Sequence, residues 1–122
     1  MSKMSVDWDG SKVWRNADGA LHRLDGPAAV GPTGSTAWWL DGLRHRLDGP
    51  AVTREDDGYN SWYASGLRHR LDGPAIIHHD RVEWYISGIR CTNFKDFQIA
   101  SGLFDDQITI LILKYGEIKL VL

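Results

Sequence analysis

The residues best suited to chemistry stand together in one seven-residue run, His-Arg-Leu-Asp-Gly-Pro-Ala. The run occurs three times without a change, at residues 22–28, 45–51 and 69–75. Imidazole and carboxylate groups this close in sequence could act as a general acid and a general base. An active site is usually a single constellation, however, whereas a motif present in every unit of a chain is most simply what makes the unit fold. We therefore interpret the run as structural and expect no catalytic residues and no enzymatic activity.

The histidines of the three runs also raise the question of a metal site. His22, His45 and His69 come from successive repeats, so at least one other strand should separate them. Strands lie nearly 5 Å apart, so equivalent rings should be about 9–10 Å from each other, whereas a metal–nitrogen bond is only about 2.0–2.1 Å long. His78 and His79 are adjacent and should point to opposite faces. We predict no metal site and no cofactor, and neither a P-loop nor a nucleophile-elbow motif is present.

The spacing of the repeated units predicts the fold. Gly19, Gly42, Gly66 and Gly88 are separated by 23, 24 and 22 residues, a period typical of repeat architectures and too short for paired helices. An Asp-Gly or Ser-Gly pair between an aromatic run and a Leu-Arg-His-Arg run is typical of a tight β-hairpin turn. The proline of each run excludes a helix through it. The sequence thus predicts a mainly β protein, an elongated single-layer antiparallel sheet of β-hairpin repeats.

The repeats should span residues 13–93 in three and a half copies, after a lead-in at residues 1–12 in which Val6 and Trp8 could alternate on an edge strand. In the segment 43–48, which leads into the second run, period-two alternation places Leu43, His45 and Leu47 on an inner face. The same alternation places Arg44, Arg46 and Asp48 on an outer face. We expect Gly49 to adopt an unusual backbone dihedral before the proline.

The C-terminal segment, residues 94–122, lacks the repeat and carries helix signals. Apolar residues at helical spacing follow Thr92 and Asn93, either of which could cap a helix that ends at Gly102. A second helix could begin at Asp105 and end before Gly116.

A buried strand is the alternative for residues 108–113, because β-branched residues crowd them. We favour two short helices, followed by an extended end at residues 118–122. This segment should cap the open end of the repeat sheet.

The segment Trp39-Leu40-Asp41-Gly42-Leu43-Arg44-His45 resembles the MORN repeat, whose core reads aromatic-x-[Asn/Asp]-Gly-x-Arg-x-Gly or close to it. The second half departs from that pattern, since Arg-Leu-Asp-Gly-Pro-Ala stands where MORN units carry Gly-x-Gly. This variant is similar to one in small proteins of large bacteriophages and giant viruses. The resemblance implies side-by-side β-hairpins in a single-layered sheet that serves as a scaffold or interaction surface.

Charge and variation within the repeat point to a binding surface. The net charge of −2 implies no bulk attraction to nucleic acid or an anionic membrane. Residues 12–92 hold ten cationic and ten acidic side chains, which favours an Arg–Asp network and leaves an anion-binding surface as the alternative. Arginine and aromatic residues vary between copies and have the composition of interaction hot spots. The predicted partner- or ligand-binding residues are Arg44, Arg68, Arg90, Trp38, Tyr63 and Tyr85.

We therefore expect a non-enzymatic binding module. The resemblance implies a bacteriophage accessory protein, a host-defence inhibitor that blocks or sequesters a host protein. The alternative is a sponge that binds a small anionic, nucleotide-derived ligand through the arginine and aromatic sheet face. Two copies could pair through a sheet edge or the C-terminal cap. A single cysteine, Cys91, and the lack of an apolar N-terminal run lead us to expect a cytoplasmic protein without a membrane segment.

Overall fold

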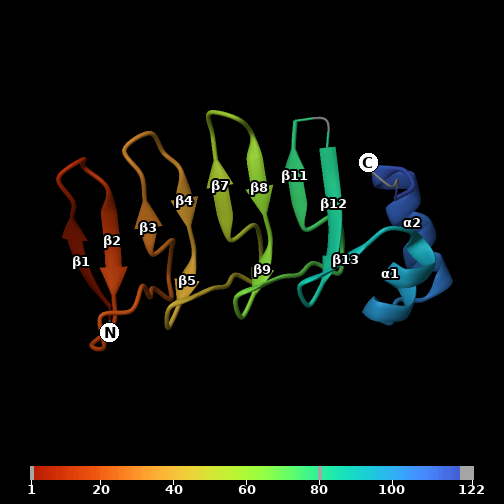
Figure 1. Ribbon diagram of the computed structural model, residues 1–122, viewed down its shortest axis with the longest axis horizontal. Helices are drawn as coiled ribbons and strands as arrows, with labels where there is room; N and C mark the ends of the chain where they lie inside the picture. Colours follow the sequence, from red (N-terminus) through yellow and green to blue (C-terminus); the bar gives the residue numbers. More distant parts are fainter. Residues whose placement is uncertain (1, 80, 119–122) are drawn as a thin grey trace.

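The chain forms a long antiparallel sheet that ends in two short helices (Figure 1). The computed structural model describes residues 2–79 and 81–118. The strands are β1 (Lys3–Val6), β2 (Lys12–Arg15), β3 (Ala29–Val30), β4 (Thr36–Ala37), β5 (Trp39–Leu40), β6 (Leu43–Arg44), β7 (Val52–Arg54), β8 (Tyr59–Ser61), β9 (Tyr63–Ala64), β10 (Leu67–Arg68), β11 (Ile76–His78), β12 (Arg81–Ile86) and β13 (Ile89–Cys91). The helices are α1 (Phe94–Ser101) and α2 (Asp105–Tyr115).

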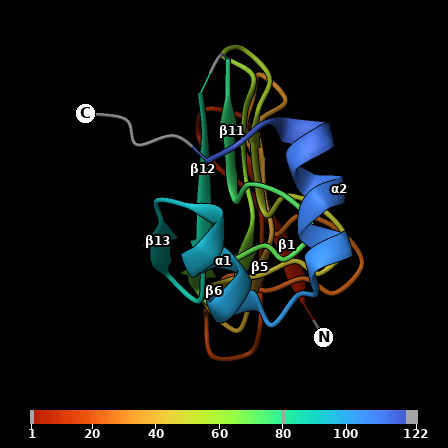
Figure 2. The ribbon, with the colours of Figure 1, turned by 90° about the vertical axis from the view of Figure 1, so that its right-hand side faces the viewer.

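Within the described residues, the main sheet has the order β1-β2-β3-β4-β7-β8-β11-β12-β13. The pairs β5–β6 and β9–β10 form short hairpins beside it, so longer and shorter hairpins alternate along the chain (Figure 1). Viewed from its end, the sheet is a single layer, and α2 lies on one side of it (Figure 2). The predicted mainly β, elongated single-layer antiparallel fold with a helical C-terminal cap is confirmed.

The β5–β6, β9–β10 and β12–β13 hairpins close through two-residue turns in which both central residues have positive φ. Asp41 and Gly42 have φ values of 48° and 82°. The Ser65-Gly66 and Ser87-Gly88 turns are nearly identical, with φ values of 49° and 85° and of 48° and 84°. Such turns match the right-handed twist of the flanking strands, which is why the Asp-Gly and Ser-Gly pairs predicted hairpins correctly.

The first copy differs, and the prediction of a two-residue turn at Asp18-Gly19 is wrong. The Asn16 N–H donates to the Ala20 carbonyl at 2.9 Å, so three residues lie between the paired positions, and of these only Gly19 has positive φ. The Asn16 side chain accounts for the wider loop, because its oxygen accepts from the N–H groups of Asp18 and Ala20 at 3.0 and 3.1 Å. The equivalent positions of the later copies hold no asparagine.

A Ser65→Asn substitution should stabilise the protein by about 0.5 kcal/mol. Ser65 holds a left-handed conformation that asparagine adopts more readily than serine. The change leaves the N–H of residue 65 in place, so its hydrogen bond to His45 is retained. Urea denaturation of the variant beside the parent measures the gain. A loss of stability would show that the serine side chain is needed at this turn.

The hydrophobic core is small and lies mainly at the C-terminal end of the sheet. Along the repeats, the last residues of the three runs, Ala28, Ala51 and Ala75, are fully buried. The main apolar cluster contains Trp84, Ile86, Cys91, Phe97, Ile108 and Leu111. Because a single-layer sheet has no second layer to pack against, the cap helices supply most of the core.

Both helices of the cap were predicted correctly. The Asn93 side chain caps α1 by accepting from the Asp96 N–H at 2.8 Å, and α1 ends at the left-handed Gly102. The strand alternative for residues 108–113 is wrong, because these residues lie within α2, which ends at Gly116. The predicted extended end lies outside the described residues, except for Ile118, which has no regular structure.

The N-terminal lead-in supplies β1, the first strand of a hairpin whose second strand, β2, runs into the first repeat. β1 is exposed along its length and pairs with β2 from Lys3–Arg15 to Val6–Lys12, which agrees with the predicted edge strand. Trp8 does not alternate with Val6 on that strand. It lies in the turn between β1 and β2 and is 100% exposed, because the strand already ends at Val6.

Candidate binding surfaces

Each His-Arg-Leu-Asp-Gly-Pro-Ala run folds into a loop that its own arginine holds closed. Cζ of Arg46 lies 4.2 Å from the centroid of the Trp38 ring. Its Nε donates to Asp48 at 2.9 Å and its Nη1 donates to the Pro50 carbonyl at 3.2 Å. The other copies repeat these contacts, with Arg23 over Trp14 and Arg70 over Trp62, each at 3.9 Å. A cation on an indole ring and two charge-assisted hydrogen bonds therefore fix each loop.

The glycine of each run leaves room for this arginine. A Cβ atom at Gly49 would lie 2.9 Å from Cζ of Arg46, and the equivalent distances at Gly26 and Gly73 are 2.8 and 2.6 Å. None of the three glycines has positive φ. The expectation of an unusual dihedral at Gly49 is therefore wrong, and its lack of a side chain instead leaves space for the Arg46 guanidinium.

The predicted alternation of faces is wrong beyond Arg44, because β6 ends there and the chain enters the loop. The Arg46 side chain is 25% exposed, whereas Leu47, expected on an inner face, is 85% exposed. Leu24 of the first run is similarly exposed at 78%. Arginine rather than leucine therefore covers the tryptophan, and the leucines project into solvent.

The histidine of each His-Arg-Leu-Asp-Gly-Pro-Ala run connects its unit to the next one. Nδ1 of His45 accepts from the Ser65 N–H at 2.9 Å, and the neighbouring Gly66 N–H donates to the Arg44 carbonyl at 2.8 Å. The histidines of the other two runs make the same contact. Nδ1 of His22 accepts from the Asp41 N–H at 3.0 Å, and Nδ1 of His69 accepts from the Ser87 N–H at 2.9 Å. The turn of one unit is thus fixed on the histidine of the preceding unit, which gives this side chain a structural role.

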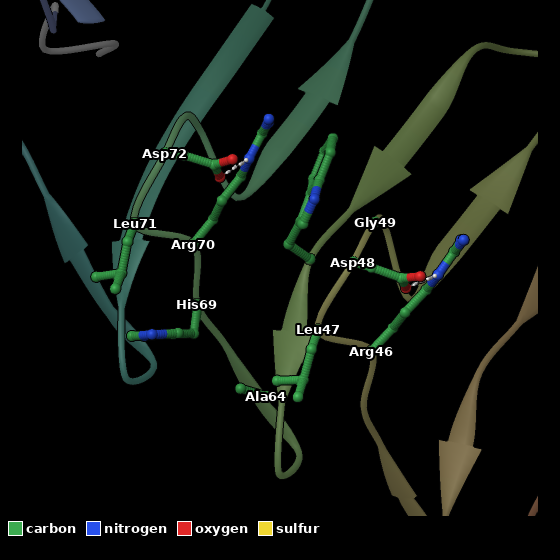
Figure 3. Close-up of a pocket in the computed structure, with 10 residues that line it drawn as sticks. Arg46, Leu47, Asp48, Gly49, Ala64, His69, Arg70, Leu71 and Asp72 are labelled. Carbon is green, nitrogen blue, oxygen red and sulfur yellow. Dashed lines mark hydrogen bonds and ion pairs between the residues drawn. The ribbon is translucent and has the colours of Figure 1, made fainter. Parts of the chain in front are cut away.

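Two equivalent grooves lie between successive loops. The larger, of about 540 Å³, lies between Arg46–Gly49 and His69–Asp72, with Trp62 and Ala64 also lining it (Figure 3). The smaller, of about 420 Å³, lies one unit earlier, where Trp38 and Leu40 occupy the equivalent positions. Ala64 in the later groove is smaller than Leu40 at the equivalent position of the earlier one. We call these spaces the Arg46–Arg70 groove and the Arg23–Arg46 groove.

The third position of this series is filled by the cap. Trp84 is the equivalent of Trp38 and Trp62, but it is only 2% exposed. In place of an arginine it meets three aromatic rings edge-on, Phe94 and Phe97 at 5.0 Å and Tyr115 at 5.7 Å. The Tyr115 hydroxyl also lies 3.4 Å from Nη2 of Arg70. Phe94 and Phe97 of α1 and Tyr115 of α2 therefore cover Trp84 together, and Tyr115 also lies against Arg70, in the space that would be the third groove.

The opposite face of the sheet carries arginines interleaved with aromatic rings. Cζ of Arg44 lies 5.2 Å from the Trp39 ring and 5.4 Å from the Tyr63 ring. Cζ of Arg68 lies 5.9 Å from Tyr63 and 5.4 Å from Tyr85. Arg90 is paired with Tyr85 across the β12–β13 hairpin, and its Nε lies 3.6 Å from Glu83. We call this series the arginine–aromatic stripe. It brings together five of the six predicted binding residues, and their binding role stays a prediction.

Trp38 lies on the other face. Its ring contacts Arg46 as Trp14 contacts Arg23, so Trp38 is the invariant tryptophan of its unit. Trp39 is the residue that belongs with Tyr63 and Tyr85, because it pairs with Arg44 as Tyr63 pairs with Arg68. The error arose because either of two adjacent tryptophans fits the motif. The spacing of 24 residues from Trp14 to Trp38 and from Trp38 to Trp62 identifies the right one.

The predicted set of binding residues omitted three further residues on the stripe face, Arg54, Tyr59 and Ser61. They come from the β7–β8 hairpin, whose register places Arg54 opposite Tyr59 and Val52 opposite Ser61. The alternation of Tyr59, Ser61 and Tyr63 was the available signal, since period two places these three side chains on one face.

No protein-family model, curated protein or solved structure matches the chain. Within residues 2–79 and 81–118, no three His, Cys, Asp or Glu side chains lie close enough together to hold a metal ion. In the same part of the chain, neither helix has the length and hydrophobicity needed to cross a membrane.

Proposed function

We propose that the protein is a non-enzymatic binding module whose grooves receive an amphipathic helix of a partner protein. The observation that carries the proposal is the position of the two cap helices. The chain fills the third space of the groove series with side chains of its own helices α1 and α2 and leaves the first two spaces open. Laying the apolar face of a helix into a groove is a common mode of protein recognition.

The contacts of α2 indicate what a bound helix would gain in the open grooves. The Arg70 side chain beside α2 is 12% exposed, whereas those of Arg23 and Arg46 are 24% and 25% exposed. α2 itself contributes Ile108 and Leu111 to the apolar cluster and adds the Tyr115 hydroxyl at the guanidinium of Arg70. A partner helix with aliphatic residues at this spacing and one aromatic residue near its end would make equivalent contacts.

The leucines at the groove rims also support a protein partner. Leu24 and Leu47 flank the Arg23–Arg46 groove, and Leu47 also lines the Arg46–Arg70 groove. Both are among the most exposed large apolar residues, at 78% and 85%. Neither packs in a core, and apolar side chains gathered along a groove are typical of interaction surfaces. The resemblance to small bacteriophage proteins adds the expectation that the partner is a host protein.

Affinity purification from the cells that naturally produce the protein tests the proposal. The parent chain should retain one partner protein. A Leu24→Asp/Leu47→Asp variant should lose at least about 30-fold in partner affinity, because placing two carboxylates where the partner makes apolar contacts should cost about 2 kcal/mol or more. Both leucines are exposed, so the variant should unfold at nearly the parent temperature. An Arg44→Glu/Arg68→Glu variant changes the opposite face and serves as the matched control.

Three outcomes of this experiment decide whether a partner binds in the grooves. Loss of the partner from the leucine variant alone supports groove binding. Loss from the arginine variant alone would overturn it and assign the partner to the stripe. If the parent chain retains no protein at all, the proposed function is wrong.

A further inference from the structure

A small pocket opens on the stripe face, opposite the grooves. Its volume is about 190 Å³. Typical ligand pockets have volumes of about 300–1,000 Å³, so this one has room for a single polar group rather than a whole drug-sized molecule. The lining residues are Arg44, Val52, Arg54, Tyr59, Ser61, Tyr63 and Arg68. Three are arginines and none is acidic.

Two of these arginines are not neutralised by a carboxylate. The third arginine, Arg54, is neutralised, because its Nη2 and Nε donate to Asp57 at 2.9 and 3.3 Å. Burial alone would raise the pKa of Asp57, but the bonds and charge of Arg54 outweigh it and hold that pKa below its usual value. In the described part of the chain, Arg44 and Arg68 have no carboxylate within 4.0 Å. The pocket therefore has an excess of positive charge.

Two buried donors in the pocket also have no acceptor. Ser61 is completely buried, and its hydroxyl has no hydrogen-bond partner within residues 2–79 and 81–118. The same holds there for Nε of Arg68, which is buried although its guanidinium is charged. A buried donor without an acceptor costs about 1–3 kcal/mol, and more when it is charged. An anion that entered the pocket and reached both donors would remove these costs and offset the charge of the arginines.

We propose that this pocket binds a phosphoryl group. Arg44, Arg68 and Ser61 line the same small space. A phosphoryl group offers three terminal oxygens and suits such a set better than a planar carboxylate, which offers two. Free phosphate and the phosphate of a nucleotide share this chemistry. In a nucleotide, the base would lie outside the pocket along the stripe, beside the partly exposed Trp39 or Tyr85.

The site is independent of the grooves. Trp62 lines the Arg46–Arg70 groove and its neighbour Tyr63 lines the pocket, so the two surfaces lie on opposite faces of the sheet. Binding of a phosphoryl group therefore succeeds or fails whatever the outcome of the partner experiment.

Titration calorimetry and thermal unfolding of the full chain test the site with inorganic phosphate, adenosine monophosphate, adenosine and sodium acetate at matched ionic strength. Phosphate should bind with a Kd on the order of 1 mM or below and raise the unfolding temperature. Arg68→Ala and Arg44→Ala should each weaken binding by at least about tenfold, because each removes a charge-assisted hydrogen bond. Lys95→Ala removes an exposed positive charge from α1 and should leave the affinity unchanged.

Two further variants separate binding from folding. Ser61→Ala should unfold at or above the parent temperature without phosphate, because the hydroxyl has no partner, yet it should bind phosphate several-fold more weakly. Arg68→Lys keeps the charge but lacks Nε, so it should bind between the parent and Arg68→Ala. Tighter binding of adenosine monophosphate than of phosphate would support the site and show that the adenosine part of the nucleotide contributes to the affinity.

Equal affinity for the nucleotide and for phosphate would also support the site and show that the phosphoryl group alone is recognised. The proposal is overturned if phosphate does not bind, if adenosine or acetate binds as tightly as phosphate, or if Lys95→Ala weakens binding as much as Arg68→Ala does.

Discussion

The Trp84→Ala variant should lose about 3–5 kcal/mol of unfolding free energy, the range typical of truncating a large buried aromatic residue. Trp84 is the residue on which the cap packs. It is 2% exposed and meets Phe94, Phe97 and Tyr115 edge-on. The resulting cavity would lie between the sheet and the two helices that pack on Trp84. We expect the two helices to loosen before the repeats unfold.

Urea denaturation followed by circular dichroism measures the total loss, and Cys91 reports on the cap. Cys91 is 5% exposed, and burial, helped by the nearby Asp96 charge, raises the pKa of its thiol. Iodoacetamide should therefore react slowly with the parent chain and much faster with the variant, below its unfolding transition. Trp8→Ala is the control, since Trp8 is 100% exposed and its loss should change stability by less than about 0.5 kcal/mol. Unchanged Cys91 reactivity in Trp84→Ala would contradict the role of Trp84 in holding the cap.

The parts of the fold that depend on neighbouring residues were predictable from the sequence. Caps such as Asn93 and Gly102 act within one helical turn, and Ser65-Gly66 sets its own hairpin. The loop of the repeated run was not predictable in the same way. Its conformation depends on Arg46 reaching Trp38, eight positions earlier, and that contact turns the arginine inward and the leucine outward, against simple alternation.

The candidate sites also divide into one that the sequence predicts and others that it does not. The stripe could be predicted because its arginines and aromatic residues vary at equivalent positions of the repeat. The grooves and the pocket could not, because each is built from two or more units. Ser61 reaches the pocket through the register of β8 against β7, and neither the burial of its hydroxyl nor its lack of a partner has a signature in the sequence.

The Gly73→Ala variant should lose about 2 kcal/mol, because its methyl group would occupy the position of the Arg70 guanidinium. A Cβ atom there would lie 2.6 Å from Cζ of Arg70. The flexible arginine can move away without a shift of the backbone, so the cost is what the arginine gives up. The Arg70 guanidinium would lose its contact with the Trp62 ring and its hydrogen bonds to Asp72 and to the carbonyl of the buried Pro74. Urea denaturation measures the loss. Gly31→Ala is the matched control, since its Cβ would meet Ser35 only at an ordinary contact distance of 3.7 Å.

A double-mutant cycle with Arg70→Ala distinguishes this explanation from a simple backbone effect. Arg70→Ala alone should cost about 2–3 kcal/mol, because it removes the same contacts. With the arginine absent, the methyl group at position 73 has nothing to displace, so the double variant should be about as stable as Arg70→Ala. The coupling energy would then equal nearly the whole cost of Gly73→Ala. If the two costs simply add, the glycine is required by the backbone. Strong coupling would show that glycine is required at this position, and at the equivalent Gly26 and Gly49, to leave space for an arginine stacked on tryptophan.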